Sequence, residues 1–190
     1  KCTYNLVDYY IMFGDGVGNG VIDTLTYKLG ADGCKLRNNY EINFVMAYAL
    51  GDTMIGNHVI DTAFFFNDGA FFGYHQVGYL EASKFMHMIL QNRIDTAVLL
   101  GNGAFSGSNE YIQLVLSPNG RYFFQHDLGD PSQLDTTKIY NDLVMVGNCD
   151  APIRIQSDSI GTQAYILYKK LQPTNADFTA QYTSMRDITM

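Results

Sequence analysis

The sequence repeats a short motif, [Ile/Leu]-Asp-Thr, four times. GNGVIDT at 18–24 returns as GNHVIDT at 56–62, and NRIDT at 92–96 and QLDT at 133–136 follow. The aspartates of the four copies recur at nearly equal intervals, and they are Asp23, Asp61, Asp95 and Asp135. A repeat of this length indicates a supersecondary unit that buries its apolar residues by packing against its neighbours.

Each copy of the motif is followed by a short apolar run, a turn and a second apolar run. AFFF-NDG-AFFG follows Thr62, and AVLL-GNG-AFSG follows Thr96. Turns of this type between β-forming residues predict β-hairpins. A third apolar run comes next in each unit. In residues 80–91, LEASKFMHMILQ, the apolar residues have the spacing of one buried helical face, which predicts a short helix.

We therefore predict an all-β fold in a single domain, residues 1–190. Aromatic residues make up 14% of the chain and charged residues 16%, a balance that favours β-structure. Four units around an axis predict a four-bladed β-propeller with short blade-closing helices, because a β-trefoil has three units. The predicted units are 21–58, 59–92, 93–132 and 133–172, with 173–190 as a tail or closing strand.

The repeat resembles the hemopexin-like family, whose blades open with Ile/Val-Asp-Ala and continue into an apolar strand, a turn and an aromatic strand. IDTAFFFNDGAFFG and IDTAVLLGNGAFSGSNEYIQL are similar to that pattern, and residues 80–91 fall where the family has a blade-closing helix. Thr replaces the usual Ala in each copy, and the chain has no Trp. The resemblance implies a four-bladed propeller with ions in its axial channel.

The four aspartates are the predicted metal ligands. In a propeller they would begin the innermost strands and converge near the axis, where four carboxylates repel one another unless a cation compensates. Oxygen ligands suit a calcium or sodium ion. The alternative is that each aspartate accepts hydrogen bonds from nearby backbone N–H groups and fixes the start of its strand.

A second set of candidates consists of aromatic and histidine side chains near the second and third units. An exposed histidine could ligate haem, and exposed rings could form a platform for a sugar, a planar ligand or a partner. The alternative is that His75 is an ordinary surface or half-buried residue and that most of the rings are core. The predicted ligand-binding residues are His75, Tyr74, Tyr79 and Tyr111. The aromatic cluster around them includes Phe64, Phe65, Phe66, Phe71 and Phe72.

Charge and cysteine content limit the partners. The net charge of −7 disfavours nucleic acids and anionic membranes and favours a cationic ligand such as a polyamine. No apolar run approaches the ~20 residues that cross a bilayer. Cys2, Cys34 and Cys149 allow one disulfide and one free thiol, and with Lys1 as the first residue they suggest a secreted, extracellular protein.

No catalytic constellation accompanies the repeat, and Ser106 lacks a Gly-x-Ser-x-Gly context. The first hypothesis is a secreted, non-enzymatic binding protein that holds a cation in the axial channel and binds a small molecule such as haem or a polyamine. The alternative is a structural or interaction module that binds proteins or glycans through its aromatic faces, or self-associates as a homo-oligomer.

Overall fold

The computed structural model describes residues 3–6, 20–27, 35–37, 39–48, 50–126, 136–169 and 178–190. Every regular element in these ranges is a β-strand, and the strands form two parallel sheets. Sheet A contains β1 (Thr3–Leu6), β2 (Gly20–Tyr27), β4 (Tyr40–Ala47), β6 (Val59–Phe65), β8 (Gln76–Ala82), β10 (Arg93–Leu99), β12 (Glu110–Leu116), β14 (Thr137–Val146), β16 (Ala164–Tyr168), β17 (Phe178–Gln181) and β19 (Ile188–Thr189). Sheet B contains β3 (Lys35–Arg37), β5 (Asp52–Gly56), β7 (Gly69–Gly73), β9 (Met86–Leu90), β11 (Gly103–Ser106), β13 (Arg121–Phe124), β15 (Ile153–Ser157) and β18 (Thr183–Arg186). None of the described residues forms a helix that could cross a membrane.

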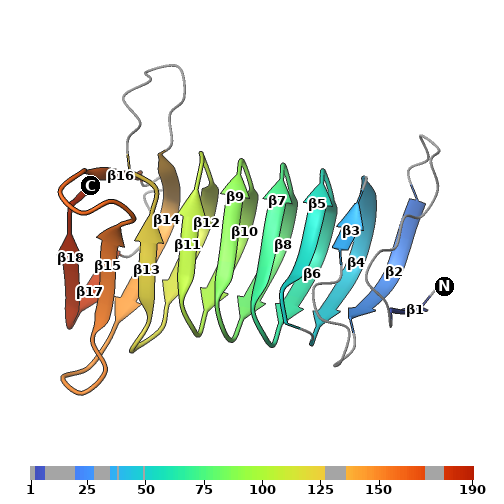
Figure 1. The fold of residues 1–190 in the computed structure, drawn as a ribbon, viewed down its shortest axis with the longest axis horizontal. Coiled ribbons are helices and arrows are strands. Elements are labelled where there is room, and N and C mark those ends of the chain that lie inside the picture. The colour runs from blue at the N-terminus through green and yellow to red at the C-terminus, as the bar shows by residue number, and fades with distance from the viewer. Residues whose placement is uncertain are drawn as a thin grey trace.

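The chain passes alternately through the two sheets. One strand of each sheet, with the turns between them, makes one coil of a β-solenoid, and the coils stack in a row from β1 to β18 (Figure 1). Each strand pairs in parallel with the equivalent strand of the next coil. Ile60 pairs with Val77, which pairs with Ile94, which pairs with Tyr111. Equivalent residues of successive coils in this region, such as His58 and His75, are 17 residues apart, and this distance is the repeating unit.

The core lies between the two sheets and is built from columns of equivalent residues. Alternate side chains of a strand point inward, and those of neighbouring coils lie one strand spacing apart, about 4.8 Å. One column of sheet A is almost wholly buried along the described coils: Leu25, Val45, Ala63, Leu80, Ala97, Leu114 and Leu143. The facing column of sheet B is Leu36, Met54, Phe71, Met88, Phe105 and Phe124. A coil cannot bury these residues alone, so stacking is what stabilises it.

The turn that leads from sheet B back to sheet A requires a backbone conformation with positive φ. Gly56, Gly73 and Gly107 occupy this position with φ of 126°, 148° and 78°. Leu90 occupies it in the coil between Gly73 and Gly107, with φ of 76°. A Cβ atom on Gly73 would collide with the carbonyl oxygen of Gly56 in the preceding coil. The turn therefore favours glycine for its backbone angle and for the close approach of the coils.

The prediction of a four-bladed propeller is wrong. The described strands form two parallel sheets, whereas propeller blades are antiparallel sheets around an axis. The turns at Asn67–Gly69 and Gly101–Gly103 occur where the sequence predicts them, but the strands that flank each turn belong to different sheets. Each apolar run pairs with its counterpart in the next coil, so no axial channel surrounds the aspartates that the structure describes.

The helix predicted for residues 80–91 is also wrong. This segment contains the end of β8, a turn and β9. Its buried residues are Leu80, Ala82, Met86 and Met88, which alternate along each strand. The turn places Met86 four residues after Ala82, and this offset imitates helical spacing. Each predicted unit from 21 to 132 spans two coils, and residues 178–190 of the predicted tail or closing strand form β17, β18 and β19.

Candidate functional site

Three of the predicted metal ligands occupy one outward position of sheet A, and Asp135 lies outside the described residues. Register places Asp23, Asp61 and Asp95 in alternate coils, with Asn43 and Gly78 at the equivalent position between them. Asn43 Nδ2 donates a hydrogen bond to Asp23 Oδ1 at 3.4 Å. Two strand spacings, about 9.5 Å, separate successive carboxylates along the solenoid.

The prediction of a metal-binding protein is wrong for the part of the chain that the structure describes. No three histidine, cysteine, aspartate or glutamate side chains in these residues lie close enough together to hold a metal ion. The physical reason is the fold. The described aspartates form a line along one face, with Asp61 and Asp95 exposed to solvent, and do not converge as they would at the mouth of a ring. A calcium or sodium ion in an axial channel has no counterpart here.

Gly78 leaves a gap between the exposed carboxylates of Asp61 and Asp95. A Cβ atom at this position would lie 2.7 Å from the carbonyl oxygen of Asp61, so the close approach of β6 and β8 favours glycine. The next residue, Tyr79, pairs with Thr62 on one side and Thr96 on the other. Its side chain extends toward Glu81 and Phe64, on the same outer face of sheet A.

Five half-exposed rings cover the neighbouring outward surface of sheet A, and we call them the aromatic strip. They are Phe44, Tyr48, Phe64, Phe66 and Tyr79. Phe64 lies at the centre, with ring centroids 5.5 Å from Phe44 and 5.9 Å from Tyr79. Tyr48 and Phe66 stack at 4.5 Å with planes 6° apart. The most exposed ring, Phe66, has 38% of its surface accessible.

The four predicted ligand-binding residues lie in different places. Tyr79 belongs to the aromatic strip, and its hydroxyl donates to Glu81 Oε2 at 2.9 Å. Partial burial, together with this hydrogen bond and the charge of Glu81, raises the pKa of Tyr79. Tyr74 is exposed at the turn between sheets B and A. Tyr111 is fully buried, and its hydroxyl has no hydrogen-bond partner among the described residues.

His75 is fully buried in a column of polar residues at the start of the sheet A strands. We call this the corner column: Tyr40, His58, His75, Asn92 and Asn109. His75 Nδ1 accepts a hydrogen bond from the backbone N–H of His58 at 3.2 Å, and Nε2 lies 3.1 Å from the carbonyl oxygen of Met54. Burial, followed by the charge of His58, lowers the pKa of His75 to about 3. Haem binding through His75 stays a prediction, and it would require this column to open.

The corner column links successive coils by one repeated pattern. The backbone N–H of each member donates to the side chain of the next, at 3.2 Å from Tyr40 to His58 and 3.2 Å from Asn92 to Asn109. Asn109 Nδ2 also donates to the carbonyl oxygens of Ser106 and Met88. Neutral histidine and asparagine both combine an acceptor with a donor, so either residue satisfies the backbone at this corner.

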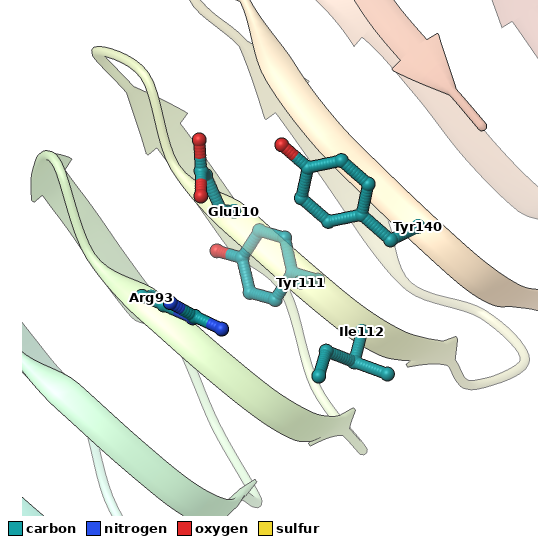
Figure 2. A pocket seen from close by; sticks show the side chains of 5 residues that line it. All are labelled: Arg93, Glu110, Tyr111, Ile112 and Tyr140. Atoms are coloured by element: carbon teal, nitrogen blue, oxygen red, sulfur yellow. The ribbon is translucent and has the colours of Figure 1, made fainter. Parts of the chain in front are cut away.

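A pocket of about 260 Å³ opens on the outer side of sheet A beyond the aromatic strip. Figure 2 shows the residues that line it: Arg93, Glu110, Tyr111, Ile112 and Tyr140. Lys138 Nζ donates to Glu110 Oε1 at 2.9 Å beside the pocket. Tyr140 lies where the pairing of β12 with β14 shifts by one residue. The pocket thus combines an aromatic ring with hydrogen-bonding charged groups.

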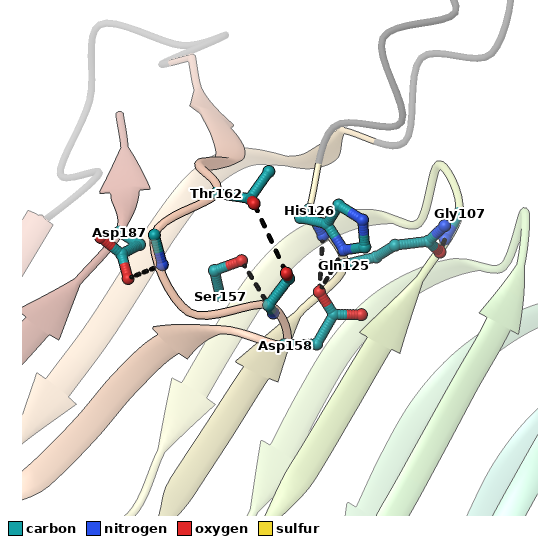
Figure 3. Close-up of polar contacts among 9 residues, drawn as sticks. Gly107, Gln125, His126, Ser157, Asp158, Thr162 and Asp187 are labelled. Atoms are coloured by element: carbon teal, nitrogen blue, oxygen red, sulfur yellow. Dashed lines mark hydrogen bonds and ion pairs between the residues drawn. The ribbon is translucent and has the colours of Figure 1, made fainter.

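A second polar cluster joins the turns of the last coils (Figure 3). His126 Nδ1 lies 2.7 Å from Asp158 Oδ1, and the same oxygen accepts from the backbone N–H of His126 at 2.8 Å. Ser159 Oγ donates to Thr162 Oγ1, and the backbone N–H of Gly161 donates to Asp187. The His126–Asp158 and Gly161–Asp187 bonds join turns of different coils, and the Ser159–Thr162 bond lies within one turn. Because the hydroxyl of Ser159 is already used in a hydrogen bond, we assign the cluster a structural role.

Part of the outer face of sheet A is predicted from the sequence. Asp61, Asp95 and Tyr79 are among the predicted site residues, and Phe64 and Phe66 belong to the predicted aromatic cluster. Phe44, Tyr48 and the pocket residues Arg93, Glu110 and Tyr140 are not predicted. Tyr48 and Phe66 are separated in the sequence by close to the length of one coil, and this spacing could have indicated that they are neighbours. Cys149 is an exposed free thiol, and Cys2 and Cys34 lie outside the described residues.

Comparison of the chain with models of protein families, with curated proteins and with solved structures gives no match. Nothing in these comparisons identifies the hemopexin-like family. The function is therefore argued from the geometry of the outer face of sheet A.

Proposed function

We propose that this chain is a non-catalytic binding module that holds a neutral polysaccharide on the outer face of sheet A. The observation that carries the proposal is the aromatic strip, whose rings continue from coil to coil on the same face of sheet A as the exposed Asp61 and Asp95. An exposed apolar patch rimmed by polar residues is typical of an interaction site. Secretion, haem binding and polyamine binding stay predictions.

Aromatic rings on this surface suit the apolar C–H face of a sugar ring. The rings of the strip are half-buried and held by contacts to one another, so their orientation is set before a ligand arrives. Such preorganisation lowers the entropic cost of binding. Phe44, Phe64 and Tyr79 follow one another on three successive strands, so the strip favours an extended chain of rings over a single small molecule.

The charges around the strip favour a ligand with hydroxyl groups and without negative charge. Asp61 and Asp95 are exposed, and a carboxylate accepts hydrogen bonds from hydroxyl groups. Glu81 is already an acceptor for Tyr79. The net charge of the chain is −7, which opposes acidic polysaccharides and nucleic acids. A neutral glycan satisfies both conditions.

The test is co-sedimentation of the protein with insoluble cellulose, chitin and mannan, and isothermal titration with the corresponding soluble oligosaccharides. We expect the protein to sediment with at least one of these polymers. The double variant Phe64→Ala/Tyr79→Ala removes the centre of the strip and should weaken binding by tenfold or more. Asp61→Asn/Asp95→Asn should weaken it less, because an amide oxygen still accepts a hydrogen bond.

The matched control is Phe72→Ala. Phe72 lies on the outer side of sheet B and is 44% exposed, so this variant removes a comparable ring from the opposite face. Binding should be unchanged in the control. Failure of all three polymers to retain the protein, or an equal loss in Phe72→Ala, would show that the strip is not a glycan site. Circular dichroism spectra of each variant check that the fold is retained.

A further inference from the structure

Charged side chains are divided unequally between the two sheets. Each sheet A strand from β2 to β14 carries one carboxylate, and two of these strands also carry a cation. The carboxylates are Asp23, Glu41, Asp61, Glu81, Asp95, Glu110 and Asp142, and the cations are Arg93 and Lys138. On sheet B, the accessible charged side chains of the described strands from β3 to β15 are all basic: Lys35, Arg37, Arg121 and Arg154. The one carboxylate of these sheet B strands, Asp52, is fully buried. The outer face of sheet A is therefore acidic, and that of sheet B is basic.

Arg121 and Arg154 show the unbalanced charge of sheet B most directly. Register places them side by side on neighbouring strands, about 4.8 Å apart, and both are exposed. Like charges in this arrangement repel each other. Neither guanidinium has an ion-pair partner among the residues that the structure describes. A surface that brings carboxylates to this position relieves the repulsion.

The middle of sheet B presents an uncharged patch, which we call the sheet B patch: Ile55, Ala70, Phe72, His87 and Ile89. Ile55, Phe72 and Ile89 form one outward column, and Phe72 is 44% exposed. Burial, opposed by the charge of Asp68, lowers the pKa of His87, so its ring is neutral at pH 7. The sheet B patch lies on β5, β7 and β9, in the same part of the solenoid as the aromatic strip on the opposite face. An exposed apolar patch of this kind is typical of an interaction site.

The two outer faces are complementary in charge, in apolar character and in size. One combines carboxylates with the aromatic strip, and the other combines arginines with the sheet B patch. The strands β6, β8, β10 and β12 have seven residues each. At ~3.3 Å per residue and ~4.8 Å between strands, sheet A from β4 to β14 presents roughly 700 Å². A standard interface buries about 800 Å² of each partner, so the faces are large enough for a stable contact.

We propose that copies of this chain stack, with the outer face of sheet A of one copy against the outer face of sheet B of the next. Contact between two acidic faces or two basic faces is opposed by repulsion, so the charges select the unlike pair. This contact is heterologous, because it joins two different surfaces. Each added copy still presents one free face of each kind, and the assembly therefore continues beyond a dimer.

The positions of the charges determine how the copies are oriented. Glu41 and Asp61 lie near the start of β4 and β6, and Arg121 and Arg154 lie at the start of β13 and β15. Strands of the two sheets start at opposite ends of a coil, since the chain runs along one sheet and returns along the other. A half turn of one copy about the normal to the sheets therefore brings the carboxylates to the end that carries the arginines. It also reverses the row of coils, so that β4 and β6 come over strands near β13 and β15.

This proposal does not rest on glycan binding. The aromatic strip takes part in both, so an oligosaccharide and a second copy compete for it. The arginines lie on the other sheet, and the variant Arg121→Glu/Arg154→Glu should abolish stacking while it leaves oligosaccharide affinity unchanged. Failure of the stack and failure of the glycan site are therefore distinguishable.

The test is sedimentation equilibrium over a hundredfold range of concentration in about 0.15 M NaCl, where the Debye length is about 8 Å. We expect the average mass of the wild-type chain to rise threefold or more, past that of a dimer. Arg121→Glu/Arg154→Glu and Glu41→Lys/Asp61→Lys should each remain at the mass of one chain. An equimolar mixture of these two variants should assemble again, because the exchanged charges attract each other and each variant keeps one unchanged face.

The matched control is Lys84→Glu/Lys169→Glu, which changes the net charge as much as the arginine variant does. Lys84 and Lys169 are exposed and lie outside the strands of both sheets, so this control should assemble as the wild type does. Recovery in the mixture also shows that the two charge variants are folded. A wild-type chain that stays monomeric, an assembly that stops at two copies, or a mixture that stays monomeric overturns the proposal.

A second measurement uses the wild-type chain alone. In NMR spectra recorded at increasing concentration, signals of the Ile55 and Ile89 methyl groups on sheet B should shift together with those of the Phe64 and Tyr79 rings on sheet A. The methyl signals of Leu114, which is fully buried, should not change. Shifts confined to one of the two faces indicate a symmetric contact between like faces and contradict the stack.

Discussion

His58 and His75 stack face to face in neighbouring coils, with ring centroids 5.0 Å apart and planes 3° apart. Both residues are fully buried in the corner column. Each ring accepts a hydrogen bond at Nδ1 from the backbone of the preceding coil. The two rings can accept these hydrogen bonds only when they are neutral, because protonation of Nδ1 removes the lone pair that accepts.

The protein should lose stability as the pH falls below about 6.5. Burial, opposed by nearby backbone carbonyls, lowers the pKa of His58 to about 4, and the pKa of His75 is lowered to about 3. In the unfolded chain both residues bind protons below their ordinary value of 6.5, whereas in the folded chain they remain neutral. The free energy of unfolding should therefore decrease between about pH 6.5 and pH 4, by up to ~1.4 kcal/mol per pH unit for each histidine. Urea denaturation at pH 7.5 and pH 5 measures the change.

The control for this prediction is the variant His58→Asn/His75→Asn. Asparagine occupies the same column at Asn92 and Asn109, so it can replace the hydrogen bonds without titrating. We expect the difference in unfolding free energy between pH 7.5 and pH 5 to shrink in this variant. An equal pH dependence in wild type and variant would assign the effect to other groups.

Two glycines with the same backbone angle should respond differently to alanine. Gly107 has φ of 78° and Gly161 has φ of 81°. A Cβ atom on Gly107 would lie 2.5 Å from the carbonyl oxygen of Leu90, whereas one on Gly161 meets nothing within 4 Å. Gly161→Ala should cost the ~1 kcal/mol of a strained φ, and Gly107→Ala should cost several kcal/mol in total. Chemical denaturation measures both, and equal losses would refute the role assigned to the close approach of the coils.

Removal of a buried hydroxyl should have opposite effects at two tyrosines. Tyr122 donates to the carbonyl oxygen of Leu99 and accepts from the N–H of Ser117, both at 3.0 Å. Tyr122→Phe leaves these groups without their partner and should destabilise the protein by about 1–3 kcal/mol. The hydroxyl of Tyr111 has no partner among the described residues, so Tyr111→Phe should be neutral or stabilising. Thermal unfolding distinguishes the two, and a loss in Tyr111→Phe comparable to that in Tyr122→Phe would contradict the prediction.

Binding of a neutral polysaccharide should depend little on salt. The proposed contacts are aromatic surfaces and hydrogen bonds, which ionic screening hardly affects, whereas attraction of a cation to Asp61 and Asp95 weakens as the Debye length shortens. We expect the oligosaccharide affinity to change less than about twofold between 0.05 and 0.5 M NaCl, where the Debye length falls below about 10 Å. Titration with spermine under the same conditions is the comparison. A steep loss of oligosaccharide affinity with salt would indicate a charged ligand.

The β-character and the turns of this fold could be predicted, but the pairing of the strands could not. Asn67–Gly69 and Gly101–Gly103 end one strand and begin the next, as their local chemistry predicts. Whether the following strand turns back on its neighbour or enters a second sheet depends on tertiary packing. The recurrence of Gly56-Asn-His as Gly73-Tyr-His, one coil later, was the sequence signal for the solenoid. The more visible aspartates mark every second coil and conceal this period.

The candidate site was also predictable only where local sequence patterns mark its residues. Tyr79 and Asp61 stand out locally, because one lies in an aromatic cluster and the other in the repeated motif. Phe44 and Arg93 reach the outer face of sheet A through the register of parallel strands, which short-range patterns do not contain. The sequence predicts His75 to be an accessible ligand, since a turn precedes it. Its burial follows from the next coil, which covers it with Asn92.

The 17-residue length that the coils share between His58 and Asn109 also determines how this part of the chain can change in size. Loss or duplication of one whole coil between Val59 and Phe105 keeps the turn, corner and core residues in their columns and shifts the molecule's length by about 4.8 Å. An insertion inside a strand that is shorter or longer than a whole coil moves the turn, corner and core residues out of their columns together. Such a protein can therefore become longer or shorter in discrete steps, and each step adds or removes one strand of each sheet together with its outward-facing side chains.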